Sequence, residues 1–182
     1  MDAMTCLLTR RSVRSYQDRQ VEEEKLQKVL EAGMYAPTGM NTQSPIMVVV
    51  QDKATRDQLS RMNAAVMNGK GDPFYGAPTV IIAAYDHDVS SHPTPDHGPE
   101  TCDFGDIDTT IALTNMENAA ASLGLGSCWV GAFDPRAVRE RFDVPESYRL
   151  VELFMIGHPK AAPGPRHTER RALDEIVCRE AF

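Results

Sequence analysis

The segment from Asp106 to Leu123 constrains the fold most, because it has the length of a helix and is apolar on nearly all sides. Asn118 is a polar residue within this segment, and it needs a hydrogen-bond partner if it is buried. A helix without a polar face must be covered all round, so we expect this one to be central. Its alanines would let another helix approach closely, in the core or between subunits. Its apolar residues are Ile107, Ile111, Ala112, Leu113, Met116, Ala119, Ala120 and Ala121.

Apolar runs elsewhere in the chain predict strands, and segments with helical spacing predict further helices. Residues 79–85 form a β-branched run between Pro78 and Asp86, which is typical of a strand buried on both faces. Helices and strands do not alternate regularly, which favours an α+β fold over a doubly wound parallel sheet. The expected strands are 48–51, 79–85, 128–130 and 150–156, and the expected helices are 2–9, 21–36, 55–67, 106–123 and 135–142.

A nucleotide-binding fingerprint of the GxGxxG type does not follow any of these strands. Gly124-Leu125-Gly126 closes a helix instead of opening one, so its glycines are interpreted as capping and turn residues. A Rossmann dehydrogenase is therefore disfavoured.

The overall composition predicts one domain that spans residues 1–182. The chain is 42% hydrophobic and 25% charged, which is ordinary for a globular protein of this length. Its formal net charge of −7 argues against general binding to nucleic acid or to a membrane surface. The sequence contains neither an apolar leader of the signal-peptide type nor an apolar run long enough to cross a bilayer, so we expect a cytoplasmic protein.

The cysteines and the histidine-rich segment were considered as metal ligands. The four cysteines are widely scattered without a CxxC pair, which indicates neither a zinc site nor a disulfide framework. The segment 86–104 is rich in Pro, Ser and Gly, and its spacings match no zinc motif, so we interpret it as a polar loop, a lid or variable insertion, and expect no metal. Its candidate ligands are Asp86, His87, Asp88, His92, Asp96, His97, Cys102 and Asp103.

An arginine cluster lies near the N-terminus, from Arg10 to Arg14. It brings three guanidinium groups and the Ser12 hydroxyl together on an otherwise acidic chain. Guanidinium groups are planar donors that match phosphate oxygens, so the cluster is a candidate anion site. Taken alone, the segment is equally compatible with a solvated basic turn.

A polar loop over residues 36–45 leads into the apolar run 46–50. It concentrates turn-forming residues with the amide side chains of Asn41 and Gln43. An amide side chain carries a donor and an acceptor, which is what recognition of the edge of a heteroaromatic ring requires.

These segments occur in an order that resembles the nitroreductase family of FMN-dependent oxidoreductases. The resemblance also includes Asn115-Met116, the strand 127–131, Gly157-His158-Pro159 and the segment 170–175, so it covers essentially the whole chain. It implies a mostly antiparallel sheet surrounded by helices, in an intertwined homodimer with FMN bound at the interface between subunits. The sequence departs from the family at Ser44-Pro45, where the family commonly has Pro-Trp.

The resemblance also implies roles for individual residues. Arg10 and Ser12 match positions that hold the FMN phosphate and ribityl region, Arg11 flanks them, and Arg14 matches a cation near N1 and the C2 carbonyl. A cation there stabilises the negative charge of reduced flavin.

The remaining implied positions belong to three further segments. The loop that the partner subunit presents to the flavin matches Pro37, Thr38, Gly39, Asn41 and Gln43. The strand whose backbone lies along the flavin N5 edge matches Trp129, Val130 and Gly131. The basic pair that closes over the phosphate matches Arg170 and Arg171, and either one of the two makes the contact.

The implied activity is FMN-dependent hydride transfer from NAD(P)H through flavin N5 to a second substrate, by a ping-pong mechanism. The flavin carries the chemistry, so no acid–base side chain is nominated. The acceptor is left open among nitroaromatics, quinones, enones and free flavin, as is the choice of NADH or NADPH. Alternatives are a reductive dehalogenase, a flavin-destroying relative and a non-catalytic regulator that binds FMN or another anion.

Overall fold

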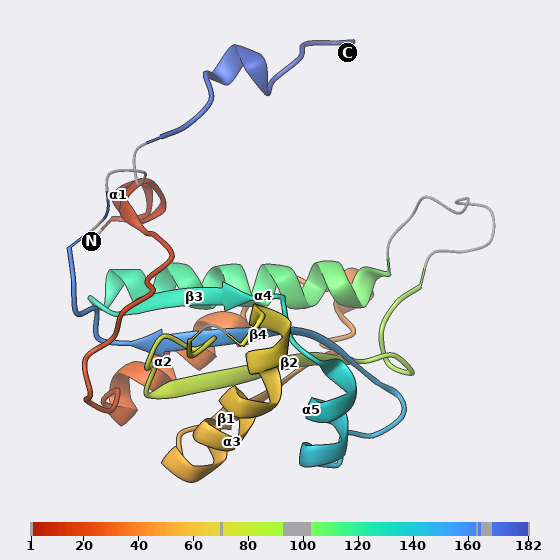
Figure 1. The fold of residues 1–182 in the computed structure, drawn as a ribbon. Helices are drawn as coiled ribbons and strands as arrows, with labels where there is room; N and C mark the ends of the chain where they lie inside the picture. The colour runs from red at the N-terminus through yellow and green to blue at the C-terminus, as the bar shows by residue number, and fades with distance from the viewer. Residues whose placement is uncertain (1, 70, 93–102, 163, 165–168, 182) are drawn as a thin grey trace.

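The computed structural model describes residues 2–69, 71–92, 103–162, 164 and 169–181. Its four strands form one antiparallel sheet in the order β1-β2-β4-β3 (Figure 1). Helices cover both faces of this sheet, which confirms the predicted α+β class. The strands are β1 (Pro45–Val50), β2 (Thr79–Asp86), β3 (Gly126–Val130) and β4 (Tyr148–Gly157).

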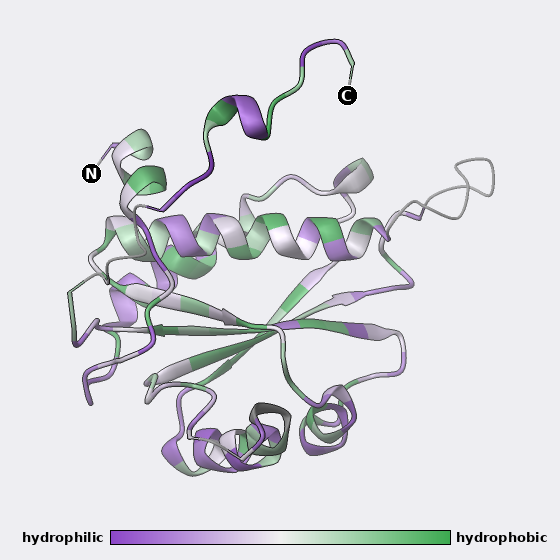
Figure 2. Cartoon of the chain, turned by 45° about the horizontal axis from the view of Figure 1, so that its top comes forward, coloured by the Kyte–Doolittle hydropathy of each residue, from purple (hydrophilic) through white to green (hydrophobic). Residues whose placement is uncertain are grey.

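The helices divide between the two faces of the sheet, as Figure 1 shows. Helices α2 and α4 cover the face of the sheet that carries Ile81 and Phe154, whereas α3 and α5 cover the face that carries Val80 and Leu153. Figure 2 shows the largely hydrophobic strands between these two helical layers. The helices are α1 (Ala3–Thr9), α2 (Glu23–Met34), α3 (Lys53–Asn63), α4 (Phe104–Ser122) and α5 (Pro135–Phe142), and the short 3-10 helices are η1 (Gly39–Asn41), η2 (Ala64–Met67) and η5 (Leu173–Glu175).

Strand β2 is buried on both faces, as its sequence predicted. Val80 and Ile82 point into the layer of α3 and α5, whereas Ile81 and Ala83 point into the layer of α2 and α4. Side chains alternate between the faces of a strand, so an unbroken apolar run is required when both faces are covered.

Helix α4 is the central helix of the molecule, which confirms the prediction from its apolar composition. It contacts α1, α2 and all four strands. Gly33 permits the close approach of α2, because a Cβ atom at this position would lie 2.8 Å from the Met116 sulfur. The side-chain oxygen of Asn118 is buried and has no hydrogen-bond partner within the part of the chain that is described.

Several element boundaries differ from the predicted ones. Helix α4 begins at Phe104 because the Asp103 side chain caps it by accepting from the Gly105 N–H. Helix α2 begins at Glu23, two residues later than expected. The segment 55–67 is not one helix: α3 begins at Lys53, capped by Asp52, and 3-10 geometry follows Asn63.

The two chain ends lie on the same side of the molecule (Figure 1). The described C-terminal residues 169–181 form an arm that projects from the body, and its apolar residues Leu173, Ile176 and Val177 are exposed. None of the described helices combines the length and the hydropathy that a bilayer crossing needs.

The packing around Gly105 leads to a stability prediction. A Cβ atom there would lie 2.2 Å from the ring of the buried Tyr85, so Gly105→Ala forces the ring or the helix to move. The gain in helix propensity is about 1 kcal/mol, and we expect the clash to exceed it, with a net destabilisation of about 1–3 kcal/mol. Urea unfolding measures the difference.

Gly164→Ala is the control, because no atom lies near a Cβ at that position. It should change stability by less than about 0.5 kcal/mol. Equal stability of Gly105→Ala and the unaltered chain would contradict the close packing described here.

Candidate functional site

The arginine cluster lies along the outer edge of β3. The Val13 N–H donates to the Ser127 carbonyl over 2.7 Å, and Ser12 forms an isolated parallel bridge with Ser127. Val13 is buried whereas Ser12 and Arg14 are exposed, as expected of an extended segment whose side chains alternate. Gly126 makes this approach possible, since a Cβ atom there would lie 2.5 Å from the Val13 side chain.

A hollow of about 220 Å³ lies between the arginine cluster and the start of β3. Arg10 and Arg11 both line it, so two guanidinium groups border a space large enough for a small anionic group. The other lining residues are Thr9, Val13, Ala121, Gly124, Leu125, Gly126, Ser127 and Pro159.

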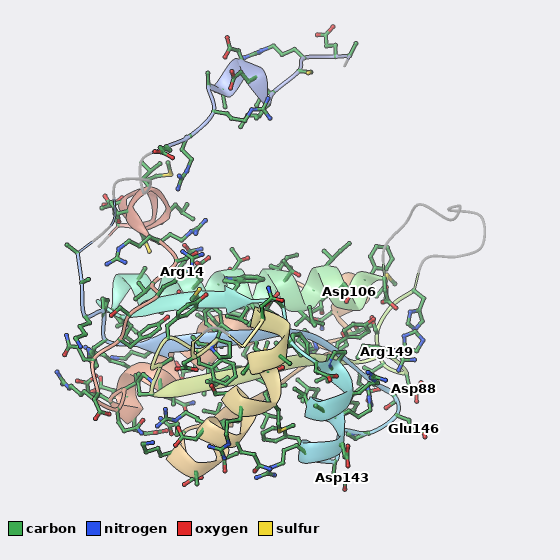
Figure 3. The ribbon with its side chains drawn as sticks, in the orientation of Figure 1. Arg14, Asp88, Asp106, Asp143, Glu146 and Arg149 are labelled. Atoms are coloured by element: carbon green, nitrogen blue, oxygen red, sulfur yellow. The ribbon has the colours of Figure 1, made fainter. Side chains whose placement is uncertain are left out.

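The three arginines have different partners. Arg10 forms an ion pair with Glu117 of α4, with 3.3 Å between Nη1 and Oε1, and Arg11 donates to the Ala161 carbonyl over 2.7 Å. Arg14 is exposed and makes no hydrogen bond or ion pair with any residue that the structure describes. Figure 3 shows it on the side of the molecule that carries α1. Arg14 is therefore available to a bound ligand.

Glu117 is a buried carboxylate that sequence reasoning missed. It is 5% exposed, and burial raises the pKa of its carboxyl, while the nearby Arg10 guanidinium acts in the opposite direction. An acidic residue within the apolar segment 106–123 was the signal that could have identified it. Its effect is to fix the position of Arg10 beside the hollow.

The loop 37–43 is anchored to the other half of α4. Both carboxylate oxygens of Asp108 accept from the Gly39 N–H, each over 3.0 Å, and Asp108 is 3% exposed. Burial raises the pKa of Asp108, which the hydrogen bond from Gly39 partly offsets. Within the loop, the Gln43 N–H donates to the Thr38 hydroxyl over 3.0 Å.

The loop also has strained backbone geometry. Met40, Asn41 and Gln43 have φ angles of 54°, 57° and 52°, in the left-handed region that non-glycine residues seldom adopt. Such strain persists only where surrounding contacts impose it, and it is commonly found at ligand-binding segments.

The structure does not bring these two segments together within one chain. Asp108 and Glu117 are nine positions apart on α4, which corresponds to about 13 Å along the axis of a helix. The loop borders a cavity of about 290 Å³, which is distinct from the hollow beside the arginine cluster. That cavity is lined by Leu30, Gly33, Met34, Ala36, Thr38, Gln43, Pro45, Met47 and Ala112.

The segment 129–131, which is predicted to lie along the flavin, includes the last two residues of strand β3. Trp129 packs edge-on against Phe154, with 6.1 Å between ring centroids, and Val130 is buried in the opposite layer. The side chain of Trp129 thus belongs to the core, and Gly131 follows directly after the strand.

Glu152 lies next to Gly131 and was also missed from the sequence. A Cβ atom at Gly131 would lie 3.2 Å from a Glu152 carboxylate oxygen. The Oε1 atom of Glu152 is buried and has no hydrogen-bond partner among the described residues. Burial raises the pKa of this carboxyl to about 7, against the opposing effect of the Leu153 and Val130 backbone groups. An acidic residue in the apolar run 150–156 was the available signal.

Arg170 and Arg171 lie on the projecting arm. Arg171 contacts Glu175 on the same arm, and Arg170 donates to the Glu169 carbonyl. Neither contacts the arginine cluster of its own chain within the described residues, so the closing role expected of them stays a prediction.

Comparison with known proteins identifies the family. The Nitroreductase family model matches residues 7–73 and 64–158. This chain belongs to the nitroreductase family. A nitroreductase family protein from Clostridium difficile has 34% sequence identity and a TM-score of 0.86, with 100% of both chains covered.

The descriptions of two further relatives name FMN. The FMN reductase (NAD(P)H) of Bacillus subtilis is 30% identical over 181 residues, covering 91% of this chain and 70% of that protein. A nitroreductase from Bacteroides fragilis, crystallised with bound FMN, has 25% identity and a TM-score of 0.78, covering 99% of this chain and 100% of that one.

The raised pKa of Glu152 predicts a pH dependence of stability in this nitroreductase family member. Between pH 4.5 and about 7, the folded chain keeps a proton that the unfolded chain has lost, so the free energy of unfolding falls as pH rises. Glu152→Gln should remove this part of the decline and stabilise the chain above pH 7. We expect on the order of 1 kcal/mol, reduced by solvent screening of a half-buried group.

Urea unfolding at several pH values measures the slope. Glu146→Gln is the control, because Glu146 is exposed and should leave the slope unchanged. Parallel pH profiles for Glu152→Gln and the unaltered chain would rule out this role of Glu152.

Proposed function

We propose that this chain is an FMN-dependent NAD(P)H oxidoreductase in which residues 1–182 act as one flavin-binding domain. The observation that carries the proposal is the arginine cluster, held along the edge of β3 beside a hollow that Arg10 and Arg11 line. The descriptions of the Bacillus subtilis and Bacteroides fragilis relatives, which both name FMN, support it.

The residues at this edge fit the anionic end of FMN. Arg10 and Arg11 would hold the phosphate, and the exposed Ser12 hydroxyl would donate to the phosphate or the ribityl chain. Arg14, which is free within the described structure, would stand beside the edge of the ring that becomes negative on reduction. Bound FMN would supply the hydride transfer, while the protein supplies orientation and charge.

The second half of the flavin site is proposed to come from a partner subunit. The loop 37–43 and the arginine cluster lie at different ends of α4, so one chain does not surround a flavin with both. Leu8 and Leu173 are 71% and 73% exposed, on α1 and on the projecting arm. An intertwined homodimer would cover this apolar surface. Arg170 and Arg171, on that arm, would then close over a phosphate.

We further propose that NAD(P)H and the electron acceptor occupy the same position in turn, as a ping-pong mechanism requires. The acceptor class is a nitroaromatic, quinone, enone or free flavin. We also propose that the protein acts in the cytoplasm.

The absorption spectrum of the purified protein tests flavin binding, and consumption of NAD(P)H with a nitroaromatic or quinone tests turnover. We expect a visible flavin absorption and acceptor-dependent oxidation of NAD(P)H. Flavin binding without turnover would indicate a regulator instead of an enzyme. A protein that neither carries nor binds added FMN would overturn the proposal.

Arg10→Ala should weaken FMN binding by about 1.5–3 kcal/mol, as expected for loss of a charge-assisted contact. Fluorescence titration of the apoprotein with FMN measures it. Arg19→Ala removes the same charge at an exposed position that pairs with Glu22, and should leave the affinity unchanged.

Loss of Arg10 also leaves the buried Glu117 without its partner, so Glu117→Gln is the second control. It weakens the ion pair but keeps the arginine, so it should lower the FMN affinity by less than Arg10→Ala does. If Glu117→Gln lost as much affinity as Arg10→Ala, Arg10 would act on the structure and not on the phosphate.

Shared active sites predict complementation between inactive variants. One variant is altered at Arg10 and Arg14, and the other at Thr38 and Asn41. In a mixed dimer both lesions fall in one site and the other site is intact, so mixing should restore part of the activity after subunit exchange. Sedimentation gives the oligomeric state. A fully active monomer would contradict the shared site.

A further inference from the structure

Three metal-ligating side chains converge near the N-terminal end of α4. The Nδ1 atom of His87 lies 3.3 Å from Oδ2 of Asp103, and the Nδ1 atom of His92 lies 3.4 Å from the same oxygen. All three ligand atoms lie within 4.8 Å of one another. Among the other candidate ligands of this segment, Asp96, His97 and Cys102 lie outside the described residues, and Asp86 and Asp88 are not part of this cluster.

The hydrogen bond of His92 determines which of its nitrogens faces the carboxylate. Its Nε2 atom lies 2.8 Å from the His87 carbonyl oxygen, which can only accept, so Nε2 carries the hydrogen. In the neutral ring Nδ1 then has a lone pair, and this lone pair is on the side of Asp103. Metal-bound histidines commonly donate their second N–H to a backbone carbonyl in this way.

His87 presents its Nδ1 atom to the same point. That nitrogen is buried and has no hydrogen-bond partner among the described residues, although Oδ2 of Asp103 is 3.3 Å away. The two imidazole rings are neighbours, with centroids 4.2 Å apart and ring planes inclined by 42°. Two imidazole nitrogens and a carboxylate oxygen thus lie at separations at which one cation can bind all three.

The carboxylate of Asp103 is oriented for this arrangement. Its Oδ1 atom accepts from the Gly105 N–H over 2.9 Å, as the cap of α4, and lies 3.4 Å from the Ser90 hydroxyl. The helix cap therefore holds one oxygen and leaves Oδ2 directed at the two histidines. Figure 3 shows Asp88, Asp106 and Arg149 at the same end of the molecule.

We propose that His87, His92 and Asp103 bind a divalent transition-metal ion, with Zn²⁺ as the best match. Bonds of about 2.0–2.2 Å in a tetrahedron place ligand atoms about 3.3–3.5 Å apart, which agrees with the two nitrogen–oxygen distances of 3.3 and 3.4 Å. Two imidazoles and one carboxylate favour zinc over Mg²⁺ or Ca²⁺, and a water molecule completes the coordination.

The expectation of no metal rested on sequence spacing, which matches no zinc motif because the ligands come from both ends of a loop. The metal would tie residues 87–92 to the start of α4. Ser91 lies between two of the ligands in this segment and against Gly39, where a Cβ atom would be 3.0 Å from its hydroxyl. Metal binding would thus fix the segment that supports the loop 37–43.

The test uses the full chain without a histidine tag, treated with chelator and titrated with ZnCl₂ by calorimetry. We expect one Zn²⁺ per chain, with an affinity at least about tenfold weaker in His87→Ala and in His92→Ala. Asp88→Asn alters the same segment without touching a ligand and should bind like the unaltered chain. The melting temperature of each variant in chelator confirms that it is folded.

Spectroscopy of the unaltered chain keeps the proposal testable if a variant fails to fold. Co²⁺ should produce the intense visible absorption of a tetrahedral site, and Zn²⁺ should shift the Nδ1 resonances of two histidines in long-range ¹H–¹⁵N spectra. Equal Zn²⁺ affinity in the unaltered chain and both histidine variants would overturn the proposal, as would a Co²⁺ spectrum of octahedral type. Flavin absorption is measured separately, so this outcome does not depend on FMN binding.

Discussion

The burial of α4 between α2 and the sheet is the constraint on which the rest of the structure depends. This helix contacts every strand, and its residues Leu113, Met116 and Ala120 are fully or nearly fully buried. Gly33 lets α2 pack closely on the buried face of α4, and this burial stabilises the fold. The face that carries Ile107, Thr110 and Thr114 is exposed in the single chain. Elements that contact α4 are therefore attached to the core of the molecule.

Two buried carboxylates on this helix position the segments proposed to bind flavin. Asp108 holds the loop 37–43 through Gly39, and Glu117 holds Arg10 beside the hollow at β3. A buried charge is costly unless it is paired, and breaking such a pair costs about 3–5 kcal/mol. The requirement that each carboxylate keep its partner thus fixes where the ligand-binding segments lie, even though neither segment belongs to the core.

The same helix separates the two segments. Its length places Arg10 and the loop 37–43 at distant points of one chain, so a site that uses both needs a second chain. The exposed apolar residues of α1 and of the C-terminal arm indicate where that chain would pack. At its N-terminal end the helix has a third attachment, because the Asp103 cap that begins α4 also faces His87 and His92.

The sequence alone determined the α+β class, the central position of α4, the two-sided burial of β2 and the arginine cluster as an anion site candidate, because each depends on a local pattern of residues. The roles of Asp108, Glu117 and Glu152 followed only from the tertiary structure, since their partners are distant in sequence. The proximity of His87, His92 and Asp103 also followed only from the tertiary structure. Their spacing in the sequence gives the separation along the chain, whereas the cap of α4 holds the two ends of the loop close together in space. Helix boundaries shifted for a similar reason, because Asp52 and Asp103 are caps whose hydrogen bonds decide where α3 and α4 begin.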